Sequence, residues 1–111
     1  MNRRSKYLGG FGLPPVSHLN SAADMVEESR RAREKISSSM DKGNCVNAFR
    51  WFRTAEEYLG KARSEVYSVL TDPSAMPGEK HEAERLEKEV RRAETRLDIS
   101  SVYFESRCIL K

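Results

Sequence analysis

Residues 45–69, CVNAFRWFRTAEEYLGKARSEVYSV, show the clearest helical pattern of the chain. Its apolar residues recur at alternating steps of three and four, which is the spacing of one face of an α-helix. This seam consists of Cys45, Ala48, Phe52, Ala55, Leu59, Ala62, Val66 and Val69. Its alternation of small and large side chains should let a partner helix approach closely. Gly60 lies inside this helix, where we expect a neighbouring backbone to pack against it.

Two further stripes of helical spacing flank this segment. The first runs from Leu19 to Met40, with Ser17 as its expected N-cap and Gly43 as the residue that ends it. Asn44, the next residue, can serve as the N-cap of the following helix. The second stripe begins at Ala83, after a loop with two prolines and a glycine, and repeats at steps of three and four. The sequence therefore predicts helices at about 17–42, 45–70 and 79–107.

These three segments predict an all-α protein, an antiparallel three-helix bundle. The junction at residues 43–44 is so short that the first two helices must be antiparallel neighbours. The alternative is a long helical hairpin whose third helix packs on another chain. Residues 98–111 are ambiguous, because Ile99 and Val102 also suit a short strand, but we favour helix to about residue 107.

Charge divides the chain into an arm and a body. It has 20 basic and 17 acidic residues, and the net charge of +3 can be assigned to Arg3, Arg4 and Lys6. Residues 1–15 are also rich in glycine and proline, so we expect an extended arm, followed by one helical domain over residues 16–111. No apolar run approaches the roughly 20 residues of a membrane span.

Little in the sequence suggests catalysis. His18 and His81 are expected to cap a helix or face solvent, and no metal-ligand spacing is present, so we expect no metal, no cofactor and no catalytic residues. The glutamates of residues 82–89 alternate with arginines and lysine, which is typical of an exposed, salt-bridged face. Cys45 and Cys108 could lie at the same end of an antiparallel bundle, but we expect a reducing compartment and therefore two unpaired thiols. The sequence thus favours a protein that is not an enzyme.

Two groups of residues could bind a partner. In the arm, Arg3, Arg4 and Lys6 could contact phosphates while Tyr7 and Phe11 stack on bases, as in single-stranded nucleic-acid binding; the alternative is a tail that only aids solubility.

In the second helix, Arg50, Trp51 and Arg53 form a candidate partner interface. Trp51 cannot share a narrow buried face with both Phe49 and Phe52, so it should point partly outward between arginines. Tryptophan and arginine are enriched at interface hot spots. The alternative is a tryptophan that lies on the edge of the bundle.

Residues 11–67 resemble a group of small proteins encoded by bacteriophages, including single-stranded-DNA phages of the microvirus type. The resemblance rests on the Gly-rich LGGFGLPP (residues 8–15), on Ser17 and His18 with Ala22 and Ala23, on Gly43-Asn44-Cys45 with Ala48, and on Ala55, Gly60, Ala62, Glu65 and Tyr67. It implies a phage setting and a non-enzymatic role.

Together these features lead to one expected function and one alternative. We expect a minor structural protein of the virion, whose helical body docks on the capsid or another phage protein and whose arm reaches single-stranded DNA or a neighbouring subunit. The alternative is a soluble phage accessory protein that binds a host factor. The expected location is the virion or the cytoplasm of the bacterial host, and we expect no membrane contact. The sequence is compatible with a monomer and with a homo-oligomer.

Overall fold

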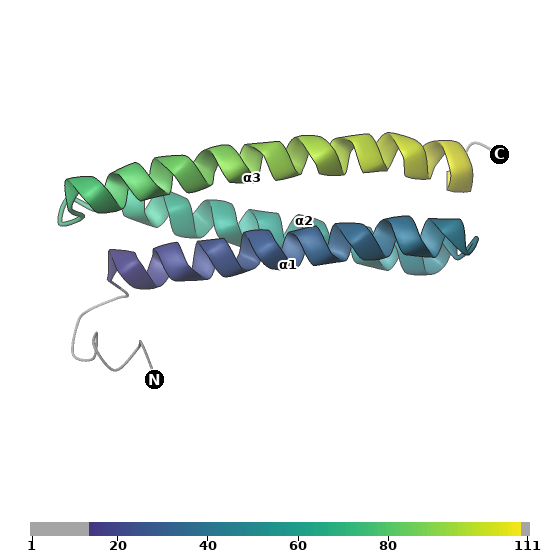
Figure 1. The fold of residues 1–111 in the computed structure, drawn as a ribbon, viewed down its shortest axis with the longest axis horizontal. Coiled ribbons are helices and arrows are strands. Elements are labelled where there is room, and N and C mark those ends of the chain that lie inside the picture. The colour runs from purple at the N-terminus through teal and green to yellow at the C-terminus, as the bar shows by residue number, and fades with distance from the viewer. Residues whose placement is uncertain (1–13, 110–111) are drawn as a thin grey trace.

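The protein is a bundle of three long helices in the computed structural model, which describes residues 14–109. Helix α1 spans Pro15–Asp41, α2 spans Cys45–Leu70 and α3 spans Pro77–Phe104, followed by a π-helical turn, η2, at Glu105–Ile109. α1 and α3 run in the same direction and α2 runs against both (Figure 1). The prediction of an all-α three-helix bundle is confirmed.

The junction between α1 and α2 follows the predicted chemistry. Gly43 has a φ of 74°, a left-handed conformation that glycine adopts at little cost. The amides of Gly43 and Asn44 donate to the carbonyls of Met40 and Ser39, a pattern that closes the end of a helix. The Asn44 side chain then accepts a 3.0 Å hydrogen bond from the Asn47 amide and caps α2.

Three predicted helix boundaries are wrong by a few residues. α1 begins at Pro15, so Ser17 lies in the first turn and is not the N-cap. α3 likewise begins at Pro77, two residues before the expected start. Both prolines occupy a first-turn position, where the missing N–H costs no hydrogen bond. At the other end, α3 stops at Phe104 and the chain continues as the π-helical turn to Ile109 rather than as α-helix to residue 107.

The core follows the predicted seams. Around Ile36, Leu59 and Phe104 lies a larger cluster towards the α1–α2 junction, and around Val66 and Leu86 lies a smaller one towards the α2–α3 loop. In α1 the polar Ser29 also lies on the buried side of the helix, where its hydroxyl donates a 2.7 Å hydrogen bond to the Val26 carbonyl. Within residues 14–109, no helix combines the length and the apolar character that a membrane crossing needs.

Two expectations about single residues are wrong. Gly60 is exposed, and a Cβ added there would meet nothing within 4 Å, so no backbone packs against it. Cys45 and Cys108 form a disulfide rather than remaining unpaired. The pair is possible because α2 begins and α3 ends at the same end of the bundle, which brings the two Cα atoms to 5.8 Å.

Candidate functional site

Two surfaces stand out: an apolar end and an arginine-lined groove. The apolar end is where α2 begins and α3 finishes, next to the Cys45–Cys108 disulfide, and we call it the disulfide end. Eight large apolar side chains are exposed among residues 14–109, and six of them lie here. These six are Val46, Phe49, Ile99, Val102, Tyr103 and Ile109.

The α3 part of this surface lies opposite the core. Phe104 and Leu97 of α3 are buried, whereas Ile99, Val102 and Tyr103 are 63%, 69% and 56% exposed. The spacing of these three at i, i+3 and i+4 puts them on a single outward face. Two turns before Val102, the same face carries the polar Thr95 and then Lys88. The outward face of α3 therefore changes from charged to apolar at its C-terminal end.

Cationic side chains adjoin the apolar surface. The Arg107 guanidinium carbon lies 5.2 Å from the centre of the Tyr103 ring, and the Arg53 guanidinium carbon lies 6.0 Å from that of Phe49. Phe49 in turn packs on Phe104, with ring centres 6.1 Å apart. Aromatic groups next to arginines are the composition that interface hot spots favour.

The structure separates the residues of the predicted Arg50, Trp51 and Arg53 interface. Trp51 is half-buried against the core, and the Lys35 ammonium of α1 lies 5.8 Å from its ring centre. Arg50 and Arg53 are exposed on the outer side of α2. The exposed aromatic beside Arg53 is therefore Phe49 and not Trp51.

The arm residues Arg3, Arg4, Lys6, Tyr7 and Phe11 lie outside the described residues. His18 is described, and its Nδ1 lies 3.1 Å from Oε2 of Glu65 on α2. The expectation of a capping or solvated histidine is therefore wrong for His18, which joins two helices. No spacing rule could have predicted that contact, since the partners are 47 residues apart.

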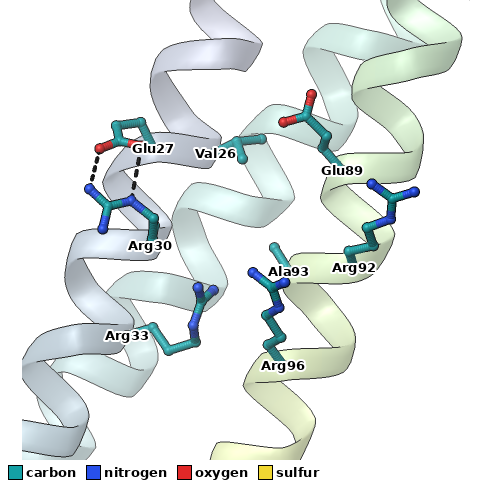
Figure 2. Close-up of a pocket in the computed structure, with 8 residues that line it drawn as sticks. All are labelled: Val26, Glu27, Arg30, Arg33, Glu89, Arg92, Ala93 and Arg96. Carbon is teal, nitrogen blue, oxygen red and sulfur yellow. Dashed lines mark hydrogen bonds and ion pairs between the residues drawn. The ribbon is translucent and has the colours of Figure 1, made fainter.

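The second surface is a groove between α1 and α3, which we call the arginine groove. Its lining comprises Val26, Glu27, Arg30 and Arg33 from α1 and Glu89, Arg92, Ala93 and Arg96 from α3 (Figure 2). Figure 2 shows the side chains of Arg33 and Arg96 reaching towards each other from the two helices. Burial, followed by the positive charges of Arg96 and Arg30, lowers the pKa of Arg33 from its ordinary value.

The groove continues towards the disulfide end. Arg33 and Arg96 also line its next section, together with Glu34, Ser37, Ile99 and Ser100. Two serines thus extend the row of hydrogen-bond donors beyond the arginines. This groove was not predicted from the sequence, because its lining comes from α1 and α3, which are separated in the chain by the whole of α2.

Comparisons of the chain with protein-family models, with curated proteins and with solved structures returned no match.

Proposed function

We propose that this protein is a non-enzymatic docking protein, whose helical body binds a partner protein through the disulfide end. The observation that carries the proposal is the concentration of exposed apolar side chains there. Apolar surface that is exposed to water costs free energy, and a concentration of it at one place marks interaction sites in soluble proteins. Three long helices with a filled core offer a rigid support for such a surface.

The chemistry of the disulfide end favours a protein as the partner. Val102, Ile99 and Phe49 offer aliphatic and aromatic area, while Arg50 and Arg107 are cations at its edge. Within residues 14–109, Arg50 has no carboxylate oxygen within 4.0 Å, and Arg107 only reaches Asp41 at 4.0 Å. The matching surface is therefore apolar in the middle and acidic at its rim.

The phage setting in this proposal rests on the resemblance of residues 11–67 to small phage proteins. A place in the virion is favoured over a host-factor role by the Cys45–Cys108 disulfide. Disulfides persist on virion and cell surfaces and are rare in the reducing cytoplasm. In the proposed arrangement the arm contacts the genome or a neighbouring subunit, while the body stays on the shell.

Particle composition tests the proposal. The chain would be produced with the phage as wild type, as Val102→Asp and as Thr95→Asp, and quantified in purified particles by mass spectrometry. Thr95 is a matched control, because it is exposed, lies seven residues before Val102 on the same helix face, and takes the same change in charge.

We expect wild type and Thr95→Asp in the particles and Val102→Asp outside them. Wild-type chain that is soluble and bound to a host protein would support the host-factor alternative. Equal incorporation of Val102→Asp would contradict docking through the disulfide end.

A further inference from the structure

The arginines of the described helices are unevenly paired. Seven of them form ion pairs with carboxylates at 4.0 Å or less: Arg30, Arg31, Arg53, Arg63, Arg85, Arg91 and Arg107. The four within residues 14–109 that form none are Arg33, Arg50, Arg92 and Arg96. Three of these four line the arginine groove. The arginines that lack a carboxylate partner are therefore gathered mainly at one place on the body.

The acidic residues of the groove are already engaged. Glu27 binds Arg30 and also lies 3.6 Å from Arg31, and Glu89 binds Arg85. Glu34, in the next section, binds Arg30. Within residues 14–109, Arg33, Arg92 and Arg96 thus have no carboxylate oxygen within 4.0 Å.

A bound anion would reduce the electrostatic repulsion between Arg33 and Arg96. Their side chains approach one another from opposite sides of the groove (Figure 2), although like charges repel. Partial burial lowers the pKa of Arg33, and the positive charge of Arg96 lowers it further. An oxyanion between the two guanidinium groups would accept hydrogen bonds from both, and such charge-assisted bonds are among the strong ones in proteins.

We infer that the arginine groove binds the phosphodiester backbone of a single nucleic-acid strand, with phosphate groups held between Arg33 and Arg96 and beside Arg92. The planar guanidinium fork matches the geometry of a phosphate group. From Val26 to Ser37 the groove runs along roughly 17 Å of α1, at 1.5 Å per residue, which suits a polymer better than an isolated ion. Ser37 and Ser100 add hydroxyl donors along the same line.

The groove has no side chains on which bases could stack. None of the residues that line its two sections is aromatic. Base stacking is the usual source of affinity beyond the phosphates in single-strand binding. The groove should therefore bind without regard to base sequence, and its affinity should fall steeply with salt.

The arginine groove and the disulfide end have Ile99 in common, but none of the three groove arginines belongs to the disulfide end. With the proposed arm contact the groove shares only the class of ligand. The two contributions can be separated, because the chain without residues 1–8 keeps the groove and lacks Arg3, Arg4, Lys6 and Tyr7.

The test measures binding of a fluorescein-labelled oligo(dT) by anisotropy over a range of salt concentrations. Five chains are compared: full-length, the chain without residues 1–8, Arg33→Gln/Arg92→Gln/Arg96→Gln in the full-length and in the truncated chain, and Lys42→Gln/Lys61→Gln/Lys88→Gln in the full-length chain. The lysine variant is the matched control, since it also loses three exposed or accessible cations, none of which lines the groove. Circular dichroism checks that each variant keeps its helices.

We expect the arginine variant to lose about tenfold or more in affinity at low salt, and its log–log salt slope to become shallower by roughly 2, at about 0.7 per phosphate contact. The lysine control should keep the full-length slope, and the truncated chain should still respond to the arginine substitutions. Equal losses in the arginine and lysine variants would overturn the inference, as would an absence of binding by the full-length chain at low salt. Displacement of the oligonucleotide by polyglutamate at equal charge would also overturn it, in favour of an acidic peptide.

Discussion

Cys45 in the first turn of α2 and Cys108 in the turn after α3 are joined by a disulfide, with their Cα atoms 5.8 Å apart. α3 is otherwise connected to the rest of the chain only through the loop at the opposite end of the bundle. The disulfide therefore ties the far end of α3 to α2, directly beneath the apolar surface that we propose as the docking site.

Removing this disulfide should destabilise the bundle substantially. The bond closes a loop with a sequence separation of 63 residues, for which the loss of chain entropy in the unfolded state corresponds to about 4 kcal/mol. Thermal unfolding of the oxidised chain should shift to clearly lower temperature on addition of reductant. The Cys45→Ser/Cys108→Ser variant should unfold at the lower temperature in either condition. A melting temperature that is the same with and without reductant would contradict the pairing.

Gly60→Ala should stabilise the protein by about 0.5–1 kcal/mol. Gly60 lies in the interior of α2 and has open space where a Cβ would be, so alanine gains helix propensity without a clash. Gly43→Ala is the informative comparison, because its φ of 74° is unfavourable for any residue with a Cβ and the variant should be less stable. Denaturant unfolding measures both. Loss of stability in Gly60→Ala would mean that a neighbouring group does occupy this side of α2.

The three helices could be predicted from the sequence, because each apolar seam is a pattern of residues only three and four positions apart. The alternating steps of α2 predicted Ala48, Ala55, Leu59, Ala62, Val66 and Val69, all of which are buried. Boundaries were less accurate at Pro15 and Pro77, where proline begins a helix instead of preceding one. The disulfide was missed because an expected reducing compartment, and not geometry, decided the expectation.

Acid should weaken the loop between α2 and α3. The Ser74 hydroxyl and amide both donate to Asp72 and hold the pKa of that carboxyl below its ordinary value. A carboxyl whose pKa is lower in the folded state than in the unfolded state stabilises the folded state at pH values above its unfolded pKa, near 3.9. This stabilisation is lost as the pH falls through the folded-state pKa. Glu27 and Glu82, whose pKa values are lowered by hydrogen bonds from Arg30 and Arg85, act in the same direction.

Melting temperatures between about pH 5 and pH 2 measure this effect. The wild-type chain should lose stability over that range, and Asp72→Asn should lose less, because its side chain accepts the Ser74 bonds without titrating. Parallel curves for the two chains would show that Asp72 has no part in the acid response.

The candidate surfaces were harder to predict than the fold. Each depends on how separate helices lie together, which a one-dimensional pattern does not contain. Arg33 and Arg96 are 63 positions apart and become neighbours only because α1 and α3 run side by side in the same direction (Figure 1). The exposed apolar face of α3 did leave a signal, since Ile99, Val102 and Tyr103 are apolar at positions opposite the seam. That signal suggested a strand as the alternative and was not interpreted as a second helix face.

Site-specific photo-crosslinking tests docking through the disulfide end most directly. A photoreactive amino acid would replace Val102 in one chain and Thr95 in another, and each chain would be irradiated in cells that produce the phage. We expect Val102, but not Thr95, to crosslink to one protein species, and Ile99→Asp in the same chain to abolish this product. Identical products from both positions, or a Val102 product that persists with Ile99→Asp, would contradict docking through the disulfide end.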